Sequence, residues 1–305
     1  MTIRHTGALM TGADPLPSPT PTKSDRCFDI DQSVSATDRL AAVCTHRSSC
    51  LSIGLEPSPR YLPPGYEPTI KDYERFLSTL IEAGKDNVAA FKMNSAFFEA
   101  LGTKGIDLMY RLREQLRGEY LIIDAKRGDI ASSAQRYAHA MYEELGADAT
   151  TVSPLMGRDS VDPFLEYTDR LTFVLCLTSN PGADDFLLPN DLFLHIAMQA
   201  AAWNTSHNAG LVVGATRPDD ARRIRDAAPT LPMLIPGIGA QGGALVETAH
   251  ATHMVGPFPG TLFHVTRGVL PDKDTVGDAV EVIRRKINGW NEQINQCLSW
   301  KETNQ

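Results

Sequence analysis

The chain has 305 residues, of which 42% are hydrophobic and 22% are charged, and its formal net charge at pH 7 is −8. This composition is ordinary for a globular protein with one large apolar core. The acidic balance excludes a broad nucleic-acid surface but leaves room for a local anion pocket, and no apolar run approaches the roughly 18 residues of a membrane-spanning helix.

Residues 1–29 are rich in proline and threonine and lack hydrophobic periodicity, so we expect a disordered tail there and a single domain over residues 30–305. The first residues also lack a charged segment followed by an apolar core, so we expect no secretory signal. Five cysteines without a Cys-x-x-Cys pair indicate reduced thiols in a cytoplasmic protein.

Beyond the tail, after a short helical pattern from Ser35, apolar runs typical of buried strands alternate with amphipathic segments. The predicted strands cover residues 50–56, 88–94, 121–126, 149–155, 171–179, 210–215, 233–239 and 262–266. The predicted helices cover residues 69–85, 104–117, 132–145, 159–167, 192–206, a segment that begins at Pro218, a segment before residue 262, and residues 274–296. Eight repeats of strand and helix in about 250 residues favour a (β/α)8 barrel over a doubly wound sheet.

The third predicted strand ends in Asp124-Ala-Lys126-Arg-Gly-Asp129. Because strand side chains alternate, Asp124 and Lys126 leave the same face. Gly128 lets the chain turn, so we expect Asp129 to bring a second carboxylate back toward Lys126. Buried charges are costly unless they are paired, so this cluster indicates a functional site rather than a surface ion pair.

In a (β/α)8 barrel the active site lies at the carboxyl ends of the strands. Polar residues stand at these ends of the predicted strands: Glu56, Lys92, Asp124, Lys126, Ser179, Gln241 and Arg267. The glycine-rich segment 236–243 allows backbone N–H groups to approach an anion. Arg267-Gly268 then offers a guanidinium that suits a phosphate, so the last two units predict a phosphate site.

Taken together, residues 91–99, 124–129, 178–183 and 236–243 resemble the orotidine 5′-phosphate decarboxylase family, and its longer bacterial type in particular. This resemblance spans about residues 50–268 and nearly every predicted strand end. It implies a lyase of pyrimidine biosynthesis that converts orotidine monophosphate to uridine monophosphate and carbon dioxide. Loss of the carboxylate at C6 leaves an electron pair that the ring cannot delocalise, so a protein without a cofactor must stabilise it electrostatically. We expect no cofactor and no metal.

The resemblance also implies catalytic roles. Lys126 would protonate C6 of the pyrimidine, and Asp124 would lie beside the substrate carboxylate. Lys92 would join Asp124 and the ribose in one charge network. Asp129, with Ser133 one helical turn later, would reach the active site of a neighbouring subunit, which implies a homodimer with shared sites.

Further roles concern binding. Glu56 would contact the ribose, and Ser179 would contact the pyrimidine edge. Gln241 and Arg267, with Gly268, would hold the phosphate.

Three positions depart from the pattern of this family. Glu56 stands where aspartate is usual, Met93 replaces a proline, and His264-Val-Thr266 stands where Ser-Ser is more usual before Arg267. These departures leave room for a paralogue that acts on or binds a modified pyrimidine nucleotide. A metal-dependent sugar-phosphate lyase of the same suprafamily is the other alternative.

Overall fold

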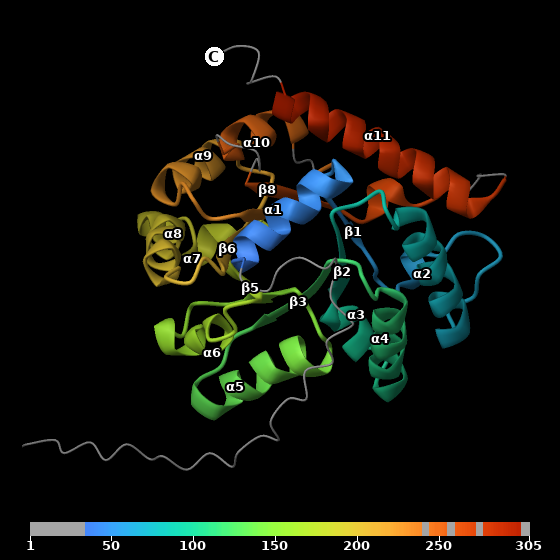
Figure 1. Ribbon diagram of the computed structural model, residues 1–305, viewed down its shortest axis with the longest axis horizontal. Helices are drawn as coiled ribbons and strands as arrows, with labels where there is room; N and C mark the ends of the chain where they lie inside the picture. The colour runs from blue at the N-terminus through green and yellow to red at the C-terminus, as the bar shows by residue number, and fades with distance from the viewer. Residues whose placement is uncertain (1–33, 240–243, 255–259, 273–276, 300–305) are drawn as a thin grey trace, which may run out of the picture.

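The computed structural model of the protein describes residues 34–239, 244–254, 260–272 and 277–299. Within these ranges, eight parallel strands pair in sequence order and β8 pairs with β1, which closes a barrel (Figure 1). The strands are β1 (Leu51–Gly54), β2 (Ala90–Asn94), β3 (Leu121–Arg127), β4 (Ala149–Val152), β5 (Leu171–Leu177), β6 (Ala209–Val213), β7 (Met233–Pro236) and β8 (Thr261–Val265). The predicted (β/α)8 barrel is confirmed, whereas the predicted tail over residues 1–29 lies outside the described ranges.

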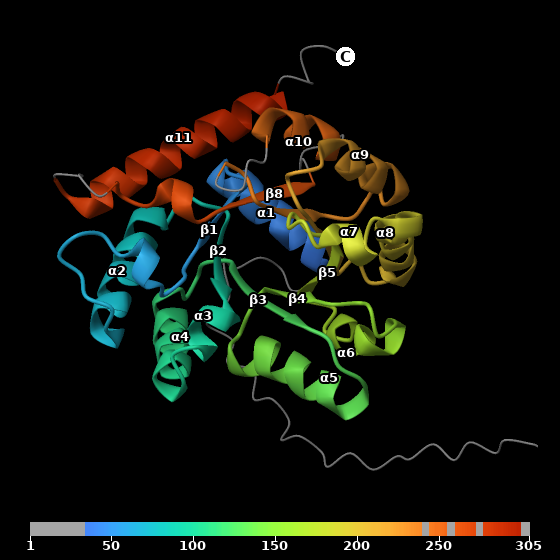
Figure 2. The ribbon, with the colours of Figure 1, turned by 180° about the vertical axis from the view of Figure 1, so that it is seen from behind.

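Helices surround the strands. The α-helices are α1 (Ala36–Arg47), α2 (Ile70–Gly84), α3 (Ser95–Glu99), α4 (Thr103–Gln115), α5 (Ala131–His139), α6 (Asp162–Leu165), α7 (Ala183–Phe186), α8 (Leu192–Trp203), α9 (Pro218–Ala227), α10 (Leu245–Thr252) and α11 (Ala279–Ser299). The short helices are η1 (Pro59–Tyr61), η2 (Ala140–Glu144), η3 (Arg158–Ser160), η4 (Pro189–Asp191) and η5 (Arg267–Val269). Seen from behind in Figure 2, α11 runs along one side of the molecule from α10 toward α2. None of the described helices is long and apolar enough to cross a membrane.

The strands are buried on both faces, which explains why their sequences are apolar without clean alternation. Every residue of β1, β6 and β8 is buried. The helices cover the outer face of the barrel with apolar stripes. On α2 this stripe consists of Tyr73, Phe76, Leu77, Leu80 and Ile81, which the sequence places at helical spacing and which the structure buries.

Helix α1 lies across the amino ends of the strands, and Figure 1 shows it crossing the middle of the ring of helices. Its Arg39 donates a hydrogen bond to the backbone oxygen of Asp169 and lies 3.4 Å from the carboxylate of Asp148. The backbone N–H of Thr37 donates to the oxygen of His207. These partners directly precede β5, β4 and β6, so α1 covers this end of the barrel and leaves the carboxyl ends for the site.

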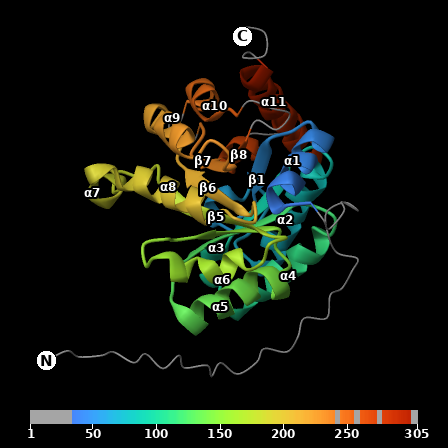
Figure 3. The same ribbon diagram turned by 60° about the vertical axis from the view of Figure 1, so that its left-hand side comes forward.

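The structure differs from the sequence prediction at some element boundaries. Strand β4 ends at Val152 rather than at residue 155, because Pro154 cannot donate to a strand ladder. The predicted helix over residues 132–145 ends in the π-helical turn η2, which buries Tyr142. Its hydroxyl is 3.1 Å from the backbone oxygen of Leu171. The sequence did not predict α3 and α7, and Figure 3 shows α7 standing away from the barrel.

Candidate active site

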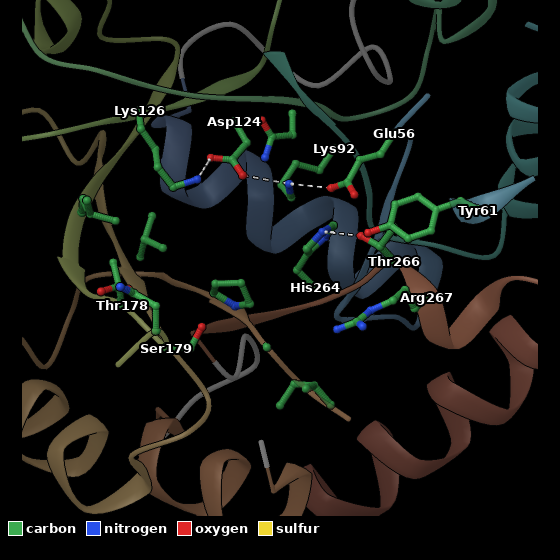
Figure 4. A pocket seen from close by; sticks show the side chains of 17 residues that line it. Glu56, Tyr61, Lys92, Asp124, Lys126, Thr178, Ser179, His264, Thr266 and Arg267 are labelled. Atoms are coloured by element: carbon green, nitrogen blue, oxygen red, sulfur yellow. Dashed lines mark hydrogen bonds and ion pairs between the residues drawn. The ribbon is translucent and has the colours of Figure 1, made fainter. Parts of the chain in front are cut away.

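A cavity of about 310 Å³ opens at the carboxyl ends of the strands. Figure 4 shows side chains from several strand ends pointing into it. Six of the predicted site residues line it: Glu56, Lys92, Asp124, Lys126, Ser179 and Arg267. Closure of the barrel therefore brings together residues that are up to 211 positions apart in the chain, from Glu56 to Arg267.

Asp124 lies at the centre of the charged cluster. Its Oδ2 is 2.9 Å from Nζ of Lys92, and its Oδ1 is 2.6 Å from Nζ of Lys126. Burial alone would raise the pKa of Asp124, but the attraction of Lys92 and Lys126 outweighs it and holds the pKa well below the ordinary range. Asp124 is therefore an anion at neutral pH, with an ammonium on each oxygen.

The two lysines differ in exposure. The Lys92 side chain is 3% exposed, whereas the Lys126 side chain is 43% exposed. Lys92 is thus a fixed internal cation that neutralises Asp124. The amine of Lys126 faces the cavity, where it can meet a bound molecule.

The backbone at Lys126 departs from a regular strand. Its φ is +47°, in the left-handed region that non-glycine residues seldom adopt. The register of β3 against β4 shifts between Ile123 and Arg127. The N–H of Lys126 donates to Oγ1 of Thr151 at 2.9 Å. Such strain costs on the order of 1–3 kcal/mol and is found at functional sites, and here it turns the Lys126 amine back onto Asp124.

Glu56 extends the cluster beyond Lys92. Its Oε1 is 3.9 Å from the Lys92 ammonium, and its side chain is 9% exposed. Burial raises the pKa of Glu56, although the positive charge of Lys92 opposes this effect. The cluster therefore alternates in sign in the order Glu56, Lys92, Asp124 and Lys126.

The sequence did not identify several residues that belong to the site. Thr151 on β4 is buried and donates to Oδ1 of Asp124 at 2.9 Å. Tyr61 and Asn94 line the cavity. His264 and Thr266, noted in the sequence only as departures, also line it. A signal existed for Thr151, because β4 carries two hydroxyl side chains, Thr150 and Thr151, in a buried strand, but which of them meets Asp124 could not be read from the sequence.

Three predicted residues do not line this cavity, and a fourth cannot be placed. Gly268 packs instead against α11, where its backbone oxygen accepts a hydrogen bond from Nε1 of Trp290 at 3.2 Å. Asp129 is half-buried and caps the adjacent N–H of Ile130 at 2.8 Å, so the turn does not bring it back to Lys126 within the chain. Ser133 is exposed on α5. Gln241 lies outside the described residues.

Among the residues that the structure describes, no three His, Cys, Asp or Glu side chains are grouped so that they could hold a metal ion. Within the cluster itself, Lys92 and Lys126 bind both oxygens of Asp124. What the arrangement offers is therefore an ammonium facing a cavity, held by a buried carboxylate. It can stabilise negative charge on a bound molecule and deliver a proton to it.

Comparison with known proteins matches this chain to one protein family. Residues 50–282 match the model of the "Orotidine 5'-phosphate decarboxylase / HUMPS family". A protein named orotidine 5′-phosphate decarboxylase from Herpetosiphon aurantiacus is 46% identical over 220 residues, which cover 70% of this chain and 82% of that protein. A protein of the same name from Delftia acidovorans is 41% identical over 232 residues, which cover 72% and 84%.

A solved structure of a protein with the same activity in its name has a similar fold. The structure of Leishmania donovani OMP decarboxylase superposes with a TM-score of 0.75 at 35% sequence identity. The match covers 87% of this chain and 99% of that one.

Proposed function

The chain belongs to the orotidine 5′-phosphate decarboxylase / HUMPS family and decarboxylates orotidine monophosphate, and we propose that Lys126 is the acid of this reaction. The bond between C6 and the carboxyl carbon breaks, carbon dioxide leaves, and the electron pair stays on C6. The Lys126 ammonium then gives C6 a proton, which yields uridine monophosphate. Lys126 regains a proton from water, so one proton is consumed for each carbon dioxide released.

The position of the Lys126 amine carries this proposal. The amine lies 2.6 Å from Asp124 and faces the cavity. Charge that develops at C6 would meet a cation that is already oriented, so little reorganisation is needed during the reaction. Asp124 holds that cation in place and would itself lie beside the substrate carboxylate.

The rest of the cavity suits the remainder of a nucleotide. Figure 4 shows Lys126 and Arg267 at opposite sides of it, as expected if the base lies at one end and the phosphate at the other. We assign the ribose to Glu56 and Lys92, and the pyrimidine edge to Ser179. We assign the phosphate to Arg267, to Gly268, which does not line the cavity, and to Gln241, which lies outside the described residues.

We also propose a homodimer in which Asp129 and Ser133 serve the site of the partner. Both residues follow β3 but lie outside the cavity of their own chain. Large apolar side chains are exposed beside them and in the loop after β4: Ile130 at 54%, Leu155 at 61% and Met156 at 57%. Exposed apolar side chains that cluster at one end of a barrel support a contact with a second copy.

Catalysis is tested by following the ultraviolet absorbance of orotidine monophosphate after addition of the purified protein, with and without EDTA. We expect turnover that EDTA does not change, and a loss in Lys126→Ala of about 10³-fold or more. Lys104→Ala, an exposed lysine on α4, is the matched control. A Lys126→Ala protein with kcat within about tenfold of wild type would exclude Lys126 as the acid. Activity that EDTA abolishes would favour the metal-dependent alternative.

The shared site is tested by mixing two inactive variants, Lys126→Ala and Asp129→Ala, and allowing subunits to exchange. A mixed dimer contains one intact site, built from Lys126 of one chain and Asp129 of the other. Random exchange should restore up to about a quarter of wild-type activity. A mixture that stays inactive although exchange is demonstrated would exclude a site shared through Asp129.

We propose a cytoplasmic location as well. Among the described residues, Cys44, Cys50, Cys176 and Cys297 are unpaired thiols, which supports a reducing compartment. Alkylation of the unfolded protein, isolated without reductant, should label every cysteine, and a protected pair would contradict this proposal.

A further inference from the structure

His264 lies where the barrel closes, because β8 pairs with β1 and His264 stands opposite Ser52 in the register. The side chain is buried, with only 7% of the residue exposed. Its Nδ1 is 3.3 Å from Oγ of Ser52, and its Nε2 is 3.1 Å from Oγ1 of Thr266. Both ring nitrogens are therefore engaged inside the protein, and Figure 4 shows the hydrogen bond with Thr266.

The imidazole is neutral. Burial lowers the pKa of His264 well below its ordinary value, and the positive charge of Lys92 lowers it further. A neutral imidazole has one N–H donor and one acceptor nitrogen. His264 can therefore orient a neighbouring hydroxyl but adds no positive charge beside Lys92.

Thr266 occupies space that Gly54 leaves open. A Cβ added at Gly54 would lie 2.2 Å from Oγ1 of Thr266, so no larger residue fits there while Thr266 keeps this position. The Thr266 side chain lies beside the Glu56 carboxylate in the wall of the cavity (Figure 4), and its hydroxyl lowers the pKa of that carboxyl. The Thr266 side chain thus lies between the His264 ring and the Glu56 carboxylate. It packs against Gly54, the last residue of β1, which has no side chain.

The direction of one hydrogen bond follows from the acceptor at its end. An ionised Glu56 can only accept, so the Thr266 hydroxyl acts toward it as a donor. The His264 ring contacts that hydroxyl through Nε2 and contacts Ser52 through Nδ1. A chain of contacts therefore runs from Ser52 through His264 and Thr266 to the carboxylate.

We propose that His264 and Thr266 are positioning residues that fix the Glu56 carboxylate, and that they thereby set the selectivity of the site for the ribose hydroxyls. This inference rests on the proposed contact between Glu56 and the ribose. Glutamate has one more rotatable bond than aspartate, so a free Glu56 side chain would lose more entropy when it binds. Asp124 and Thr151 hold the Lys126 residue in place independently of Thr266. Loss of the Thr266 hydroxyl should therefore change KM more than kcat.

The test compares Thr266→Val, which removes only the hydroxyl function at similar size, with Thr266→Ser, which keeps it. The probes are uridine monophosphate and its 2′-deoxy and 3′-deoxy analogues, used as competitive inhibitors of decarboxylation. In wild type we expect at least one deoxy analogue to bind about tenfold more weakly than uridine monophosphate. Thr266→Val should reduce that discrimination to about threefold or less and raise KM, with kcat changed by less than about threefold. Thr266→Ser should restore the discrimination.

A second variant keeps the proposal testable if Thr266→Val does not fold. His264→Phe fills similar space without either hydrogen bond, and it should reduce the discrimination in the same direction. Unchanged discrimination in a folded variant, or a fall in kcat with no change in KM, would overturn the positioning role. Absence of turnover in the wild-type protein would instead refute the proposed function, so the two failures are distinguishable.

Discussion

The hydroxyl of Thr151 accepts a hydrogen bond from the backbone N–H of Lys126 at 2.9 Å. The same hydroxyl donates to Oδ1 of Asp124, also at 2.9 Å. A single buried side chain on β4 therefore contacts both Asp124 and Lys126 of β3. It stabilises the left-handed backbone at Lys126 and orients the carboxylate that the Lys126 amine contacts.

Removal of this hydroxyl should slow the reaction. Thr151→Val keeps the size of the side chain but leaves the Lys126 N–H without its acceptor and Asp124 without a donor. Hydrogen bonds to charged groups contribute about 1.5–3 kcal/mol, so we expect kcat to fall by about 10- to 100-fold. Steady-state kinetics provide the measurement. Thr151→Ser should stay within a few-fold of wild type, and equal losses in both variants would argue against this role.

Asp124 should contribute a pH-dependent part of stability. Its folded-state pKa is depressed, so the contribution is complete above the unfolded pKa of about 3.9 and is lost as pH falls toward the folded pKa. Among the described residues, Asp124→Asn leaves the buried Lys92 ammonium with Glu56 as its one ion-pair partner, at 3.9 Å, which should lower the free energy of unfolding by about 3 kcal/mol.

Urea unfolding of wild type and Asp124→Asn at several pH values measures this contribution. The difference between the two proteins should be constant from pH 7 to about pH 5 and should shrink only below about pH 4. In a Glu56→Gln background, which removes the neighbouring carboxyl, a difference that already shrinks between pH 7 and pH 5 would mean that the pKa of Asp124 is not depressed.

Protonation of Glu56 should lower kcat/KM at acidic pH. Burial raises its pKa above the ordinary value of 4.5, so the ionised form is lost at a higher pH than for an exposed glutamate. Because ribose hydroxyls would donate to the carboxylate, kcat/KM should fall as pH drops through that pKa. In Glu56→Gln, the fall in kcat/KM that is due to protonation of Glu56 should be absent.

The substrate phosphate also titrates, but it does so identically for both proteins. The ratio of the wild-type profile to the Glu56→Gln profile therefore isolates Glu56. A ratio that stays constant from pH 8 to pH 4.5 would show that Glu56 does not act as an ionised acceptor.

Gly268 should be required for packing. A Cβ there would lie 2.8 Å from Nε1 of Trp290 and 2.8 Å from Cγ1 of Val265. Gly268→Ala should therefore lower the free energy of unfolding by about 1–3 kcal/mol, and displacement of the adjacent Arg267 should raise KM. Thermal unfolding and kinetics check both effects.

The combination of Gly268→Ala with Trp290→Phe tests the cause. Phenylalanine lacks the indole atoms Nε1 and Cζ2 that the new Cβ would meet, so the double variant should lose less stability than the sum of the two single losses. Additive losses would indicate that the glycine acts through something other than its contact with Trp290.

The barrel and most of the residues at the rim of its site could be predicted from the order of the amino acids. Strands that are covered on both faces must be apolar along their length, so Glu56, Lys92, Asp124 and Lys126 stood out where each run stopped. Alternation along one strand also placed Asp124 and Lys126 on a common side. These inferences are local, because they need only the period of one strand and the rule that active sites lie at strand carboxyl ends.

Contacts between residues of different strands depend on how the whole barrel folds. Thr151 reaches Asp124 because β3 and β4 pair with a shifted register, and His264 reaches Ser52 because β8 closes onto β1. From the turn after Lys126 we expected Asp129 to return to the charged cluster. In the structure, Asp129 instead lies outside the cavity of its own chain. Register, closure and the path of a turn are set by the packing of the whole barrel, and a spacing in the sequence does not record them.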